Sequence, residues 1–243
     1  GRWEWMRPTV EALAKHHRVI TFSLCDERTS PFPCDLDKAF ENYVEQVDLA
    51  LDRAGVDTAI IAGVSYGGLI ATEFAARRPE RVTGLVLASA LHKSWMPNSR
   101  QQQFLRSPLL MSPLFVVTAP GRMHAEMRAS FPHLGERLRF MTTYGSSVAL
   151  ALASPAKMAR RVTWAHRHRF AEGNEVKAPA LLVTGEPGLD QVVPVDVSRR
   201  YLDDLRNTKH VILERTGHNG LVTRPDDFAH VLGRFVDGLR LSA

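Results

Sequence analysis

Residues 57–78 read DTAIIAGVSYGGLIATEFAARR, in which two apolar runs flank a serine set between glycines. The first run, residues 57–62, is short and partly β-branched, which predicts a buried strand. The second run, residues 68–78, predicts a helix that Pro79 ends. Ser65 is therefore expected on a tight turn between strand and helix. Such a turn holds a nucleophilic serine in a strained backbone conformation that pushes its hydroxyl clear of the sheet.

The neighbours of Ser65 fit the same turn. A side chain two residues before or after the serine would collide with the turn, so small residues are expected there, and both positions, Gly63 and Gly67, are glycine. The amide of Tyr66 should be left free at the start of the helix. It is therefore expected to stabilise negative charge as a backbone oxyanion donor.

A serine hydroxyl is a poor nucleophile until a base takes its proton and a third group orients that base. Both partners follow downstream. Asp190 comes after the predicted strand 178–185, and His218 comes after the predicted strand 209–214. Catalytic groups in open α/β sheets gather at the carboxyl ends of the strands, so we predict that Ser65, Asp190 and His218 lie at one sheet edge.

The residue types leave alternatives open. Glu186 is a second candidate acid in the same loop as Asp190, whereas Asp196 fits the cap of the following helix better. Taken singly, Ser65 could be a turn serine and His218 a loop histidine that caps a strand. Three motifs in this order, each directly after a predicted strand, favour catalytic roles.

With these motifs the sequence resembles the α/β-hydrolase superfamily, specifically its capped branch of serine esterases and lactonases. The resemblance covers nearly the whole chain except its middle. It rests on Gly63-Val-Ser65-Tyr-Gly-Gly68, on Gly185-Glu186 with Asp190 and Pro194, and on Gly217-His218 with Pro225. It implies an α/β fold, with nucleophile, acid and base roles on Ser65, Asp190 and His218.

Strands that alternate with helices predict a mostly parallel sheet with helices on both faces. The predicted elements besides those above are a helix at 3–15, a strand at 18–24, a helix from Asp35 to Gly55, a strand at 81–88 and helices at 198–205 and 225–239. We expect residues 1–91 and 172–243 to form the α/β-hydrolase core.

Residues 92–171 interrupt the strand rhythm and are expected to form a helical cap, or lid, over the site. Six of the seven methionines lie in this segment. Because thioethers are flexible, a methionine-rich lid suits an adaptable apolar pocket and a hydrophobic ester substrate.

The sequence departs from the family in two places. In the family, an N-terminal strand ends in a His-Gly loop whose amide is the second oxyanion donor. That strand and loop have no counterpart here, so we expect the N-terminal strands to be missing and interpret the sequence as a truncated form. The loop at Cys25–Ser30 also lacks the glycines of the family pattern.

Composition narrows the remaining classes. The net charge is +5 and the pI is about 9.5, yet no nucleic-acid motif or phosphate loop accompanies the basic residues. The densest basic stretch, residues 160–169, is interpreted as the solvated face of a helix. Two cysteines give neither a disulfide framework nor a metal cluster, and no apolar run is long enough to span a membrane. We expect a cytoplasmic protein.

The sequence therefore predicts a serine hydrolase that cleaves small to medium, largely apolar carboxylic esters through an acyl-enzyme. It needs no metal or organic cofactor, its partner is the small-molecule ester, and its oligomeric state is left open. The same three residues would also serve a lactonase, a carbon–carbon bond hydrolase, a perhydrolase or an aminopeptidase. An alternative of another class is a ligand-binding protein on a hydrolase scaffold. Such a protein would be non-catalytic or would complete a single turnover, and the missing oxyanion strand is consistent with it.

Overall fold

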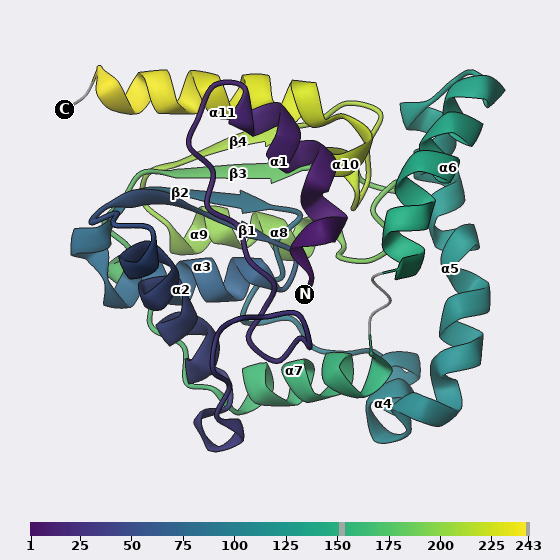
Figure 1. Ribbon diagram of the computed structural model, residues 1–243, viewed down its shortest axis with the longest axis horizontal. Coiled ribbons are helices and arrows are strands. Elements are labelled where there is room, and N and C mark those ends of the chain that lie inside the picture. The colour runs from purple at the N-terminus through teal and green to yellow at the C-terminus, as the bar shows by residue number, and fades with distance from the viewer. Residues whose placement is uncertain (151–153, 242–243) are drawn as a thin grey trace.

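The computed structural model describes residues 1–150 and 154–241, and its centre is a parallel sheet of four strands (Figure 1). The strands lie in the order β1-β2-β3-β4. Their bounds are β1 Ala59–Val64, β2 Val82–Ala88, β3 Ala180–Thr184 and β4 Thr208–Ile212. The four predicted strands from residue 57 onward are thus confirmed, and so is the α/β fold class with a mostly parallel sheet.

Helices cover both faces of the sheet (Figure 1). One face carries α1 (Arg7–Ala14), α10 (Gly220–Thr223) and α11 (Pro225–Arg240). The other carries α2 (Glu41–Arg53), α3 (Gly67–Arg77), α8 (Val195–Arg199) and α9 (Tyr201–Asp204). Short 3-10 turns, at Trp3–Met6, Leu36–Lys38, Pro79–Arg81 and Gly173–Glu175, complete the core.

The strand β2 shows why the sheet is buried on both sides. Successive side chains point to opposite faces, so Leu85 and Leu87 join the cluster under α2 and α3, whereas Val86 and Ala88 join the cluster under α11. All four are at most 1% exposed. A continuous apolar run is what a central parallel strand requires.

The predicted strand at residues 18–24 is wrong, because this segment pairs with no strand in the described chain. A strand needs a ladder partner, and β1 pairs only with β2. Part of the segment's backbone is satisfied by a buried side chain instead. Gln46 accepts from the amide of Cys25 at 2.8 Å and donates to the carbonyl of Ser23 at 2.9 Å.

Residues between β2 and β3 form four helices, α4 (Ser99–Arg106), α5 (Pro108–Ser130), α6 (Leu134–Leu150) and α7 (Pro155–Arg167), apart from residues 151–153, which lie outside the described part. In Figure 1, α5 and α6 stand beside the sheet rather than over either face. The methionines here are not one buried cluster, since Met127 is 9% exposed and Met96 is 71% exposed. No described helix combines the length and apolar character needed to cross a bilayer. The assignment of residues 92–171 to a cap stays a prediction.

The basic stretch 160–169 does not form a fully solvated face, which corrects the sequence interpretation. The side chain of Arg161 is 7% exposed and binds both oxygens of Asp26, the closer at 2.6 Å, and Glu27 at 2.5 Å. Because Arg161 lies on α7, this buried network ties α7 to the loop after residues 18–24. The sequence alone could not pair these residues, because about 135 positions separate them.

Arg161→Met should lower the free energy of unfolding by about 3–5 kcal/mol, because it removes the buried guanidinium that binds both carboxylates. Asp26 would keep only the longer contact with Arg160, and Glu27 only that with Lys157. Urea unfolding at pH 7 measures the loss. Arg160→Met is the matched control, since the side chain of Arg160 is 35% exposed and its ion pair with Asp26 should contribute at most about 1 kcal/mol. Equal losses in the two variants would contradict a special role of Arg161.

The same network predicts an acid-sensitive contribution to stability. Burial alone would raise the pKa of Asp26 and Glu27, but the hydrogen bonds and charge of Arg161 hold both below their ordinary values. Since the folded-state pKa values are depressed, this stability is present above the unfolded pKa values, near 4, and is lost as the pH falls through the folded ones. The free energies of unfolding of wild type and Arg161→Met should therefore approach each other as the pH falls from 7 to 3.

Candidate active site

Ser65 follows the last residue of β1 and precedes α3, as the sequence predicts. Its φ is +52°, a left-handed conformation that is strained for a residue with a side chain. Backbone hydrogen bonds hold it there. The Ser65 amide donates to the carbonyl of Ala88 at 3.1 Å, and the Ser65 carbonyl accepts from the amide of Leu91 at 2.9 Å. Both partners belong to β2 and the loop after it, so the neighbouring strand fixes the turn.

The glycines around Ser65 differ in how much space a side chain would find there. A Cβ on Gly63 would lie 2.3 Å from the carbonyl oxygen of Gly67, so Gly63 must be glycine. A Cβ on Gly67 would meet nothing within 4 Å, which corrects the expectation of a collision there. The crowded position is Gly68, where a Cβ would lie 2.4 Å from the Cβ of Ala90. Close packing of α3 on the loop after β2 therefore depends on Gly68 instead.

Two alanine substitutions test this packing. Gly68→Ala should destabilise the protein by about 1–3 kcal/mol, because the added methyl group overpacks against Ala90. Gly67→Ala should be neutral or stabilising by up to about 1 kcal/mol, because it adds a better helix former in open space. Thermal unfolding of the two variants measures the difference. A destabilised Gly67→Ala variant beside a normal Gly68→Ala variant would refute this interpretation.

Asp190 and His218 lie in hydrogen-bond contact in the loops after β3 and β4. Nδ1 of His218 is 3.1 Å from Oδ2 of Asp190. The other oxygen of Asp190 accepts from the amides of Val192 and Val193, at 2.9 and 2.8 Å, and the carboxylate is 1% exposed. A carboxylate fixed in this way can orient the imidazole and stabilise its cationic form.

Glu186 and Asp196, the other acidic residues near Asp190 in the sequence, have different partners. Glu186 accepts from the amide of Arg215 at 2.6 Å and so ties the acid loop to the histidine loop. Asp196 is exposed in the first turn of α8, where it favours the helix N-terminus. Gly217 allows the loops to meet, because a Cβ there would lie 2.3 Å from the carbonyl oxygen of Leu189.

Ser65, Asp190 and His218 follow parallel strands and therefore lie at the same end of the sheet. Between described atoms, the hydroxyl of Ser65 makes no hydrogen bond to His218, so the structure joins the acid to the base but not the base to the serine. Free enzymes often complete that contact only with substrate. The amide of Tyr66 lies at the N-terminus of α3 and donates no hydrogen bond to another described residue.

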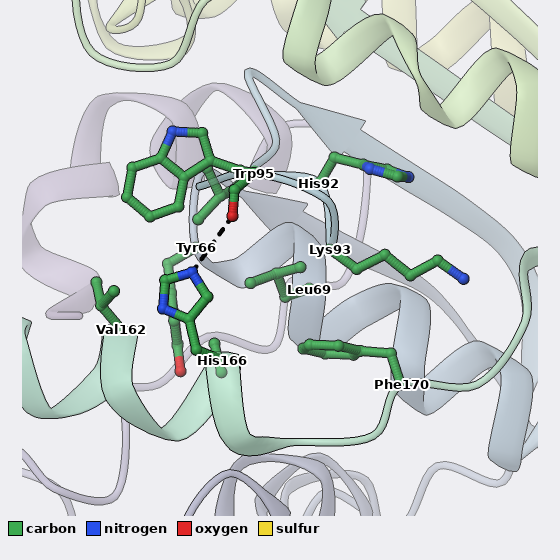
Figure 2. Close-up of a pocket in the computed structure, with 10 residues that line it drawn as sticks. Tyr66, Leu69, His92, Lys93, Trp95, Val162, His166 and Phe170 are labelled. Carbon is green, nitrogen blue, oxygen red and sulfur yellow. Dashed lines mark hydrogen bonds between the residues drawn. The ribbon is translucent and has the colours of Figure 1, made fainter. Parts of the chain in front are cut away.

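A pocket opens beside the turn, between α3, the loop after β2, and α7 (Figure 2). The pocket is shallow, with enclosed room for about one water molecule. Its walls are mainly apolar or aromatic, and its lining includes Tyr66, Leu69, Leu91, Trp95, Val162 and Phe170. In Figure 2 the ring of His166 faces the backbone of Trp95, and its Nε2 lies 3.3 Å from that carbonyl oxygen. The three candidate catalytic residues do not line this pocket.

Sequence reasoning missed Glu126, a buried carboxylate on α5 that contacts the residue after His218. One signal could have marked it, because Glu126 and Glu136 are the two acidic residues of the strongly basic segment 92–171. Within the described ranges, no three His, Cys, Asp or Glu side chains form a group that could hold a metal ion.

Comparison with known proteins agrees with this architecture. The family model described as the alpha/beta hydrolase fold matches residues 1–225. A carbamate hydrolase named RutD in Pseudomonas savastanoi pv. phaseolicola is 23% identical over 258 residues, covering 98% of this chain and 90% of the relative. A pimeloyl-[acyl-carrier protein] methyl ester esterase of Neisseria meningitidis is 25% identical over 221 residues, covering 86% and 79%.

Among solved structures, a bromoperoxidase from Bacillus anthracis superposes with a TM-score of 0.74. It is 18% identical, and the match covers 97% of this chain and 88% of that structure. At this identity the likeness concerns the fold.

Proposed function

Because this chain belongs to the alpha/beta hydrolase fold family, we propose that it is a serine hydrolase that cleaves carboxylic esters of small to medium, largely apolar substrates. The observation that carries the proposal is the contact between His218 and the buried Asp190, at the sheet edge where Ser65 sits in a strained turn. A nucleophile, a base and an orienting acid are the parts that acyl transfer requires.

In the first step His218 takes the proton of the Ser65 hydroxyl as the serine oxygen attacks the ester carbonyl. Asp190 holds the imidazole in the right tautomer and stabilises the cation that forms. His218 then gives the proton to the leaving alcohol, which leaves an acyl group on Ser65. In the second step His218 activates a water molecule that releases the acid and restores the serine.

The amide of Tyr66 would donate to the oxyanion that develops on the carbonyl oxygen. Its place at the N-terminus of α3 adds the favourable end of the helix dipole. A site with one such donor in place of two would be slower by about 10²–10³. The proposed mechanism uses no metal or organic cofactor.

The substrate class is proposed from the apolar surface beside Tyr66 and from the relatives. The lining there is mainly apolar and aromatic, which suits an apolar acyl or alcohol group, although the pocket as it stands is too small to hold one. The esterase relative acts on a methyl ester by its name, which supports ester chemistry for this chain. The carbamate hydrolase relative indicates that acyl substrates other than esters are also possible. The same three residues would also serve a lactonase, a carbon–carbon bond hydrolase, a perhydrolase or an aminopeptidase.

A binding protein on the same scaffold is the second candidate, favoured by one observation, the lack of a hydrogen bond between Ser65 and His218. Intact-mass labelling with a fluorophosphonate, followed by peptide mapping, separates the two. A hydrolase should give one adduct, located on Ser65. A folded chain that gives no adduct, or one that acylates once and stalls in pre-steady-state kinetics, would instead be a binder.

A further inference from the structure

Glu126 is a carboxylate of α5 that is buried against the loop carrying His218. It is 2% exposed. One carboxylate oxygen accepts from the backbone amide of Asn219 at 2.9 Å, and the other accepts from the Asn219 side-chain amide at 3.1 Å. α5 therefore reaches the histidine loop through a charged group and not only through apolar packing.

The contact bears on His218 because Gly217 and Asn219 flank it in the chain. On the Gly217 side the loop packs closely on the backbone of Leu189, next to Asp190. On the Asn219 side, Glu126 receives two hydrogen bonds. The backbone of His218 is thus held from two directions, by the acid loop of the core and by α5.

Nearby, Ser130 provides a useful comparison. It lies one turn further along α5, is also buried, and donates to the carbonyl of Arg215 at 2.8 Å. It joins the same helix to the same loop, but it touches neither residue that flanks His218. If α5 served only to dock the helix on the core, loss of the Ser130 contact and loss of the Glu126 contact should affect the site equally.

Burying a carboxylate costs more free energy than burying an uncharged acceptor, because the charge loses its hydration. Glu126 offsets part of that cost by accepting two hydrogen bonds from Asn219. Burial raises the pKa of Glu126, and the hydrogen bonds from Asn219 oppose that rise without cancelling it. What Glu126 offers the histidine loop is therefore a pair of acceptors fixed on α5.

We propose that Glu126 is a positioning residue of the candidate active site, which holds the His218 loop in place through Asn219. The proposal rests on the function proposed above. It adds that α5, through Glu126, helps to position His218, the proposed general base.

Glu126→Gln tests this role, because it keeps the shape of the side chain and removes its charge. We expect fluorophosphonate labelling of Ser65 at pH 7 to slow by about 10- to 100-fold, since small errors in the placement of a base reduce rates by such factors. The ring signals of His218 in NMR spectra should also shift, because its loop is no longer held in the same place. Ser130→Ala is the matched control and should leave the labelling rate and those ring signals unchanged.

Two results would overturn the proposal: an unchanged labelling rate and unchanged His218 ring signals in Glu126→Gln, or equal losses of labelling in Glu126→Gln and Ser130→Ala. Should Glu126→Gln not fold, Glu126→Asp keeps the charge and shortens the reach. Slower labelling of that variant supports the positioning role, and wild-type labelling contradicts it. If the wild-type chain itself takes no label, the proposed hydrolase function fails, while the His218 ring signals still decide whether Glu126 holds the histidine loop in place.

Discussion

Ser65→Ala is expected to abolish ester turnover, with a loss of about 10⁶-fold in kcat, because no other group can form the acyl-enzyme. The rest of the site should survive, since alanine also fits the small turn between β1 and α3. Hydrolysis of p-nitrophenyl acetate by the purified variant measures the loss, and fluorophosphonate labelling should disappear with it.

The matched control is Ser89→Ala. Ser89 also follows a strand of the same sheet, has a positive φ of 41° and is 3% exposed. It has no part in the proposed mechanism, so its variant should retain turnover within about threefold of wild type, the scale of one modest interaction. Wild-type turnover in Ser65→Ala would remove the serine from the mechanism, and a covalent adduct elsewhere would identify the true nucleophile.

Asp190→Asn should lower kcat by about 10⁴-fold, because asparagine keeps the contact with His218 but favours the wrong tautomer of the imidazole. Two backbone amides already point at this side chain, so the amide can be placed with its oxygen toward them. Its nitrogen then faces Nδ1 of His218, which leaves the imidazole proton on the nitrogen that should receive the proton of Ser65.

Glu186→Gln is the control for that experiment, because Glu186 is the other acid that the sequence allows in this loop. Its carboxylate binds the amide of Arg215 and should be replaceable by an amide with less than about a tenfold change in kcat, the scale of one lost hydrogen bond to a charged group. If Glu186→Gln lost more activity than Asp190→Asn, the acid role would move to Glu186.

The confirmed strands and the turn at Ser65 were predictable because their signals are local. A short β-branched run, a helical run that proline stops, and a serine between glycines each depend on residues within a few positions. The order of the three loops along the chain then follows from a parallel sheet, whose strand ends meet at one edge.

Predictions failed where the outcome depends on a distant partner. Residues 18–24 have the composition of a strand, but a strand forms only where another backbone offers its ladder, and Gln46 satisfies part of this segment instead. The stretch 160–169 has a basic pattern, but only the fold places Asp26 and Glu27 beside Arg161. A charge pattern in the sequence gives the charge of a segment, but it does not identify the residues that pair with it.

The sequence by itself therefore determined the strand–turn–helix at Ser65, the α/β class, and the candidate residues Asp190 and His218. Tertiary structure decided which acid contacts the histidine, which glycine is crowded, and that Glu126 on α5 touches the histidine loop. The physical reason is one of range. Backbone preference and hydrophobic period act over one or two turns of chain. A buried charge can join residues about a hundred positions apart, such as Glu126 and Asn219, and even the crowding of Gly68 depends on Ala90 in another element.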